Sequence, residues 1–238
     1  MNPARSGRLR GVLFACGIAS SLLYIAMNVL GALQYPGYSL VSHMVSELSA
    51  IGAPSRPLWV AVGFGYDVLL IAVALGILGT ADRNRALRIV GWLLFAYAVL
   101  GFAWPPMHVR GAGFTLTDAL HIAFTVATVV VILLTLGFGA FAFGRSFRLY
   151  SVATLLIVLV FGALAGMDGP RIAAGRPTPW TGLTERINIG AYLLWIIALA
   201  VALLRHRLQR AVRARPRLRR KRERSEEHTS ELQSLAYI

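Results

Sequence analysis

Six long apolar stretches are the feature of this sequence that most restricts its fold. A helix that spans a membrane needs about 20 mainly apolar residues. The stretches cover approximately residues 11–33, 58–79, 87–104, 118–142, 147–167 and 184–204. The composition agrees, because 57% of the residues are hydrophobic, 14% are charged and the mean hydropathy is +0.64. The sequence therefore predicts an all-α, polytopic membrane protein, a bundle of six transmembrane helices.

Basic residues orient the predicted bundle. Short basic segments fall at the amino end, between the second and third stretches, between the fourth and fifth, and after the sixth. Because Lys and Arg accumulate in cytoplasmic loops, both termini are expected in the cytoplasm. The other three connections then lie outside, with Trp59, Trp104 and Trp180 in an aromatic belt at that boundary. Arginine is abundant whereas Lys221 is the single lysine, which favours a bacterial source and hence the bacterial inner membrane.

The segment after the sixth stretch has two unlike parts. Residues 206–223 are densely basic, which predicts contact with anionic lipids of the inner leaflet. Nucleic acid is not expected as a partner, because the run directly follows a membrane span. Residues 224–238 turn acidic, and their first part, RSEEHTSELQS, matches the conceptual translation of a common sequencing adapter. We therefore interpret residues 224–238 as non-native and assign the membrane domain to residues 1–205.

The first outer connection carries a helical pattern. Between residues 39 and 51, apolar side chains recur at helical spacing and polar ones take the opposite side. This pattern predicts an extra amphipathic helix lying at the membrane surface. His43, Ser46 and Glu47 fall on its polar side, with His43 and Glu47 four residues apart.

Ionisable residues also gather in the other two outer connections. Pro105 and Pro106 end the third stretch. Thr115 and Asp118 have the spacing of a capping box at the start of the fourth. The remaining candidate site residues at this face are Arg56, His108, Arg110, His121, Asp168, Glu185 and Arg186.

Three segments resemble a known family. They are HMVSELSAIGAPSRP after the first stretch, PPMHVRG after the third, and TGLTERI at the start of the sixth. As a set they resemble the integral membrane family catalogued as domain of unknown function 998, over roughly residues 10–205. The resemblance implies a multi-span bacterial or archaeal membrane protein and brings no assigned reaction, so it implies no catalytic residue.

The outer arginines favour a binding function. Their guanidinium groups can make two-pronged contacts to phosphate or carboxylate. These arginines are Arg56, Arg110, Arg171 and Arg186. The first hypothesis is therefore that the protein binds a lipid headgroup or small ligand at its outer face. The same arginines can instead form salt bridges that hold the loops together. The acidic partners would be Glu47, Asp118, Asp168 and Glu185.

Two alternatives use other residues. His43, His108 and His121 with nearby carboxylates suit zinc, which would make the protein a metal-dependent membrane hydrolase. No HExxH-type signature supports that site.

Asp67 carries the third hypothesis. Counted at 1.5 Å per residue, it lies about 14 Å inside the membrane, where carboxylates are often functional. A small-solute or proton-coupled transporter would titrate it. Alternatively, Asp67 hydrogen-bonds to Asn28, Tyr97 or Tyr192 and ties helices together. No internal repeat supports transport.

Overall fold

The computed structural model describes the backbone of residues 3–81 and 84–235, and the side chains of residues 7–81 and 84–209. Side chains of the basic tail from residue 210 onward, and of residues 224–238, therefore lie outside the described residues. The chain divides into two units, Met1–Ala200 and Val201–Ile238, and the bundle described below belongs to the first. Its elements are α1 (Pro3–Leu33), the 3-10 helix η1 (Val45–Ser49), α2 (Arg56–Leu78), α3 (Arg85–Phe102), α4 (Leu116–Gly139), α5 (Arg145–Met167), α6 (Gly169–Ala173) and α7 (Thr181–Leu235).

The described residues contain six helices that are long and apolar enough to cross a membrane, which confirms the predicted six-helix, all-α architecture. Each overlaps one of the six predicted stretches. The observed spans are Gly7–Leu33, Arg56–Leu78, Arg85–Phe102, Leu116–Gly139, Arg145–Ala173 and Thr181–Gln209.

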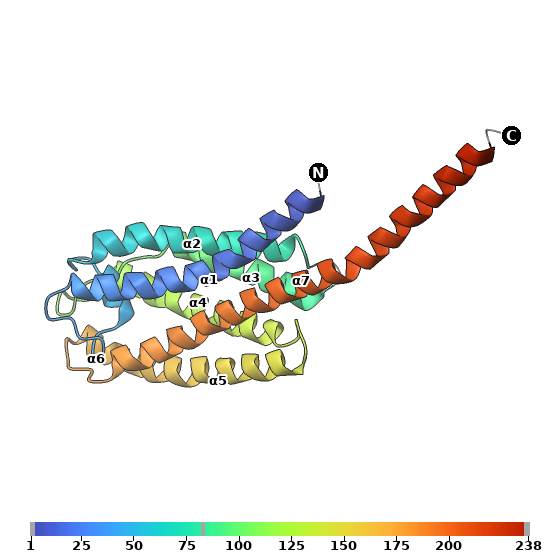
Figure 1. Ribbon diagram of the computed structural model, residues 1–238. Coiled ribbons are helices and arrows are strands. Elements are labelled where there is room, and N and C mark those ends of the chain that lie inside the picture. The colour runs from blue at the N-terminus through green and yellow to red at the C-terminus, as the bar shows by residue number, and fades with distance from the viewer. Residues whose placement is uncertain (1–2, 82–83, 236–238) are drawn as a thin grey trace. The chain divides into compact units, whose positions relative to one another are not determined.

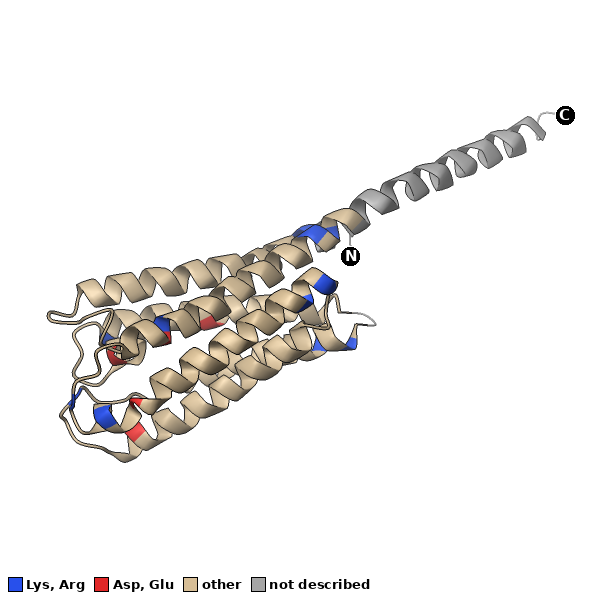
Figure 2. Cartoon of the chain, turned by 90° about the horizontal axis from the view of Figure 1, so that it is seen from below, with Lys and Arg blue, Asp and Glu red and all other residues tan. Residues whose placement is uncertain are grey.

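The long helices of residues 1–200 lie side by side (Figure 1). Along the chain, α1 packs on α2, α2 on α3, α3 on α4 and α4 on α5. The connections 34–55, 103–115 and 168–180 lie at one end of the bundle, which we call the loop end, together with η1 and α6. Among the described residues, acidic side chains occur at the loop end and once within the bundle, whereas basic residues occur at both ends (Figure 2).

Trp195 of α7 joins three helices. Its side chain is fully buried, and its indole nitrogen donates a hydrogen bond of 2.8 Å to Ser151 Oγ of α5. A β-carbon at Gly139 of α4 would lie within 2.9 Å of the indole, so only glycine leaves room for the ring. A large aromatic side chain against a glycine thus fixes the packing of α4, α5 and α7 away from the loop end.

Asn84 caps the start of α3. Its side-chain oxygen accepts a 2.9 Å hydrogen bond from the amide of Leu87, and its side-chain nitrogen donates a 3.0 Å bond to the carbonyl of Ala142. Asn84→Ala removes both bonds, and we expect it to lower the free energy of unfolding by about 1 kcal/mol. Asn84→Asp keeps the capping oxygen but loses the side-chain nitrogen that donates to Ala142, so its free energy of unfolding should fall by less. Thermal unfolding in detergent measures both; equal losses would show that the cap contributes nothing.

The predicted amphipathic helix over residues 39–51 is wrong in extent and type. Residues 40–43 form turns, and only Val45–Ser49 is helical, as the short 3-10 helix η1. The expected polar side is not solvated either, because Glu47 is 2% exposed. Part of the polar pattern in this connection therefore marks buried contacts.

The cause is competition for backbone carbonyls. The carbonyls of Leu40 and His43 accept hydrogen bonds from Arg186, and that of Ser42 accepts from Arg110. An α-helix needs these carbonyls for the amides four residues later. Because guanidinium groups from other segments hold them, the helical pattern is not realised.

Candidate ligand-binding site

Arg186, at the start of α7, donates hydrogen bonds from its side chain to backbone carbonyls of the first connection. One terminal nitrogen donates to the carbonyls of Leu40 at 2.8 Å and His43 at 3.0 Å. The other donates to the Tyr38 hydroxyl at 2.6 Å and to Asn28 Oδ1 at 3.3 Å. The guanidinium that the sequence suggested for a ligand is therefore used to hold residues 38–43 against α7 and α1.

Tyr38 completes this contact. Its hydroxyl donates a 2.7 Å hydrogen bond to the carbonyl of Met44, and the Arg186 guanidinium lies 5.5 Å from its ring centre. Burial raises the pKa of the Tyr38 phenol to about 12, so the hydroxyl stays protonated and keeps its donor at neutral pH. His43 stacks on the same ring at 5.3 Å.

Arg110 and Glu47 form a two-pronged salt bridge between the first and second connections. Arg110 Nε lies 2.8 Å from Glu47 Oε2, and a terminal nitrogen lies 2.7 Å from Oε1. The carboxylate also accepts the amide of Met44 at 2.8 Å, which closes the start of η1. The two side chains are only 3% (Glu47) and 18% (Arg110) exposed. This pair matches the salt-bridge alternative for the arginines and separates Glu47 from His43.

The backbone joins the same two connections. The amide of Ile51 donates to the carbonyl of Met107 at 2.7 Å, and the amide of Val109 donates to the carbonyl of Ile51 at 3.2 Å. The result is a single parallel bridge between Ile51 and His108. This register brings His108 to the start of α4.

Asp118 binds His108 at that point. Its carboxylate accepts from the His108 amide at 2.7 Å and lies 3.0 Å from His108 Nδ1. It also accepts the Thr115 amide at 2.9 Å, so the predicted capping box is present. His121, the expected neighbour of Asp118, instead places its Nδ1 2.8 Å from the carbonyl of Pro105.

The remaining predicted residues also contact the loops. Arg56 donates to the carbonyl of Ser49 at 2.5 Å, and Glu185 accepts from the amide of Val45. Asp168 accepts from the Thr181 hydroxyl. Its ion pair with Arg171, at 3.6 Å, is exposed.

The three histidines of the zinc hypothesis make separate local contacts. His43 Nδ1 accepts from the amide of Ser39 at 3.0 Å, while His108 and His121 engage Asp118 and Pro105. Within residues 7–81 and 84–209, no group of three or more His, Cys, Asp or Glu side chains is arranged to hold a metal ion. The structure therefore does not bring the proposed zinc ligands into one site.

A cavity of about 870 Å³ lies next to the contacts of the loop end, between the helices of the bundle. Its walls come from all seven α-helices and from the first two long connections, including Ser46 of η1. Four apolar residues of the wall are 41–59% exposed, so the cavity opens to the surroundings of the bundle. They are Phe64, Phe102, Ile122 and Val126.

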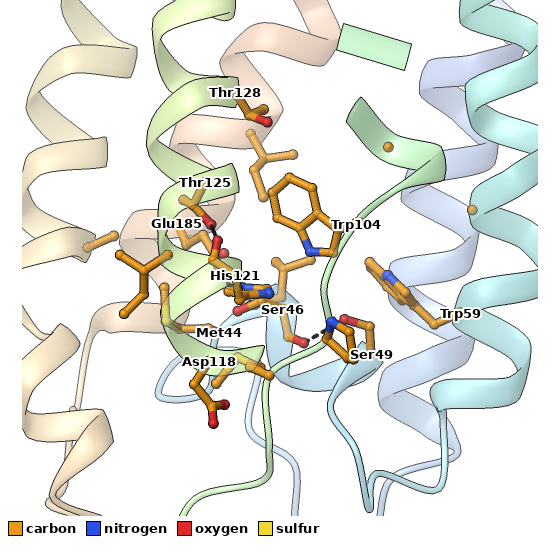
Figure 3. Close-up of a pocket in the computed structure, with 18 of the residues that line it drawn as sticks. Met44, Ser46, Ser49, Trp59, Trp104, Asp118, His121, Thr125, Thr128 and Glu185 are labelled. Atoms are coloured by element: carbon orange, nitrogen blue, oxygen red, sulfur yellow. Dashed lines mark hydrogen bonds between the residues drawn. The ribbon is translucent and has the colours of Figure 1, made fainter. Parts of the chain in front are cut away.

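Polar groups lie at two depths of the cavity. Near the loop end are Arg56, His108, Arg110, Asp118 and Glu185. Deeper in the bundle are Asp67 and the hydroxyls of Thr128 and Tyr192, two buried groups that have no hydrogen-bond partner among the described residues. Figure 3 shows Thr128, Thr125, His121 and Asp118 following one another along α4, with Trp104 and Trp59 across the space.

Sequence reasoning missed most of the aromatic lining of the cavity. Trp59 and Trp104 were assigned to an interfacial belt, yet both line the cavity. Tyrosines from α1, α2, α3 and α7 join them there: Tyr24, Tyr66, Tyr97 and Tyr192. The available signal was a tyrosine inside each of four apolar stretches, because a hydroxyl within a bundle needs a polar neighbour or a cavity.

Comparison with known proteins places residues 18–202 in one family. No curated protein and no solved structure matches the chain. The family model described as "Protein of unknown function (DUF998)" matches residues 18–202, so the chain belongs to the DUF998 family.

Proposed function

We propose that the protein binds a largely apolar molecule, a lipid or a small amphiphile, in the cavity beneath the loop end. The observation that carries this proposal is the cavity itself. Its volume of about 870 Å³ falls within the range of roughly 300–1,000 Å³ typical of ligand pockets. Apolar walls with a few polar groups are also typical of such pockets.

The hydrogen bonds and the ion pair among the connections support binding, because they hold the loop end of the cavity in place. Arg110 is bound to Glu47, and Arg186 is bound to carbonyls, so these two side chains hold the loops at this end together. Arg56, His108 and Glu185 line the loop end of the cavity. By the positive-inside rule we place this end outside the cytoplasmic membrane, and residues 206–223 against inner-leaflet lipid.

The two alternatives receive unequal support. The metal-dependent hydrolase needs a group of ligands that the described residues do not assemble. Transport is the second candidate, because Asp67 lines the cavity deep in the bundle. Binding is common to transport and to a pure receptor, so it is tested first.

The test uses a dodecanol that carries a photoactivatable diazirine as a neutral amphiphile. We expect it to label peptides that contain Trp59 and Trp104, and unlabelled dodecanol to compete. Gly166→Leu adds a side chain at the cavity wall where a β-carbon meets no other atom, so it should reduce labelling. Mass spectrometry of lipid that co-purifies with the wild type distinguishes a lipid from a small ligand.

Gly190→Leu is the matched control. Gly190 also has open space around its β-carbon position but does not line the cavity. Its labelling should equal that of the wild type. Labelling that is equal in both variants, or confined to peptides away from the cavity, would contradict the proposal.

A further inference from the structure

Asp67 is a buried acid at the cavity wall, and its carboxylate has no partner among the described residues. The residue is 6% exposed and lines the cavity wall. Among the described residues, no hydrogen bond or ion pair engages its side chain. The nearest arginine along α2 is Arg56, eleven residues earlier, which is about 16 Å away along the helix axis.

The fold leaves room for this carboxylate at one point of α3. A β-carbon at Gly101 would lie 2.5 Å from Asp67 Oδ2, so any larger residue there would displace the side chain. The carboxylate therefore packs against the bare backbone of α3. This packing fixes its place at the cavity wall.

Aromatic rings surround the same depth of the cavity. Tyr66 precedes Asp67 on α2, and Tyr97 lies one turn before Gly101 on α3. The hydroxyls of Tyr66 and Tyr97 are 3.2 Å apart, and the ring of Tyr97 lies 5.7 Å from that of Tyr192. All three tyrosines line the cavity.

An unpartnered, buried carboxylate beside aromatic rings favours a ligand with a positive charge. A lone ionised carboxylate in a low-dielectric site is costly, and an opposite charge removes most of that cost. Aromatic faces attract ammonium groups, the more strongly when the site excludes water. A Ca²⁺ ion takes about six to eight oxygen ligands, which one carboxylate and tyrosine hydroxyls do not provide.

We propose that the deep end of the cavity, formed by Asp67, Tyr66, Tyr97 and Tyr192, is a subsite for an organic ammonium group. The ligand of the cavity is then a cationic amphiphile, with its ammonium at Asp67 and its apolar body along the walls. This inference rests on the proposed binding function, because it assigns the charge of the molecule that the cavity holds.

The test compares dodecyltrimethylammonium, below its micelle concentration, with dodecanol as competitors of the diazirine label. In the wild type the ammonium should compete about tenfold or more better than dodecanol. In Asp67→Asn this advantage should vanish, whereas labelling by the neutral probe should persist. Gly190→Leu, which adds a side chain in open space away from the cavity wall, should retain the advantage.

A second measurement needs no variant and so does not depend on Asp67→Asn folding. Dicyclohexylcarbodiimide reacts with carboxyl groups buried in membranes, and peptide mapping reports modification of Asp67. We expect dodecyltrimethylammonium to protect Asp67 and dodecanol to protect it much less.

The outcomes separate the two proposals. Neutral labelling with no preference for the ammonium, or a preference unchanged in Asp67→Asn, overturns the ammonium subsite and leaves the binding function standing. The same holds if both competitors protect Asp67 equally, because the ammonium would then gain no affinity from the carboxylate. No competable labelling by the neutral probe overturns the binding function itself.

Discussion

Arg110→Ala is expected to destabilise the protein by about 3–5 kcal/mol, the usual result of removing one partner of a buried ion pair. Glu47 would keep a carboxylate that is 3% exposed and has lost both of its guanidinium hydrogen bonds. The carbonyl of Ser42 would lose a donor as well. The thermal unfolding midpoint in detergent, followed by tryptophan fluorescence, measures the effect.

Arg171→Ala is the control for that experiment. Its ion pair with Asp168 is longer, at 3.6 Å, and its side chain is 56% exposed. Exposed pairs contribute about 0–1 kcal/mol, so this variant should unfold close to the wild type. If both arginine variants unfold alike, burial does not strengthen the Arg110–Glu47 pair. Glu47→Ala combined with Arg110→Ala, analysed as a double-mutant cycle, then gives the coupling directly.

Gly182→Ala is expected to cost about 3 kcal/mol, at the upper end of the range for overpacking. A β-carbon at this position would lie 2.7 Å from the carbonyl oxygen of Leu40 and would also overlap that of His43. Backbone cannot rotate away as a side chain can, so the first connection would have to move. That movement breaks the hydrogen bond of 3.0 Å from the Leu183 amide to the carbonyl of Val41.

Gly190→Ala provides the comparison on the same helix. No atom lies within 4 Å of its β-carbon position, and alanine favours a helix over glycine by about 1 kcal/mol. This variant should match or exceed the stability of the wild type. A Gly182→Ala protein as stable as Gly190→Ala would mean that the first connection is not held against α7.

The bundle could be predicted because the length and composition of an apolar stretch are enough to identify a membrane span. Helix starts marked by local chemistry were also accessible, as with Thr115 and Asp118, whose capping box depends on two residues three positions apart. The true structure of residues 39–51 could not be predicted in this way. Their pattern is helical, but a pattern of side chains does not reveal which backbone carbonyls other segments will occupy.

The candidate site was accessible only in part. Charge alone marked Arg110 and Glu47 as possible partners, although 63 residues separate them in the chain. The pairing of Asp118 with His108 depends on the register of the Ile51 bridge, which no short motif encodes. The cavity depends on how the helices pack, so the sequence could give its tyrosines but not the space between them.

The arginine contacts of the first connection also bear on how the chain is made. Residues 38–43 leave the ribosome long before Arg186, whose guanidinium binds the carbonyls of Leu40 and His43. The contacts between the first connection and Arg186 therefore form only after the last span has been synthesised. Synthesis of the first connection and formation of these contacts are thus successive events, and the last span completes a cavity wall that the first third of the chain began.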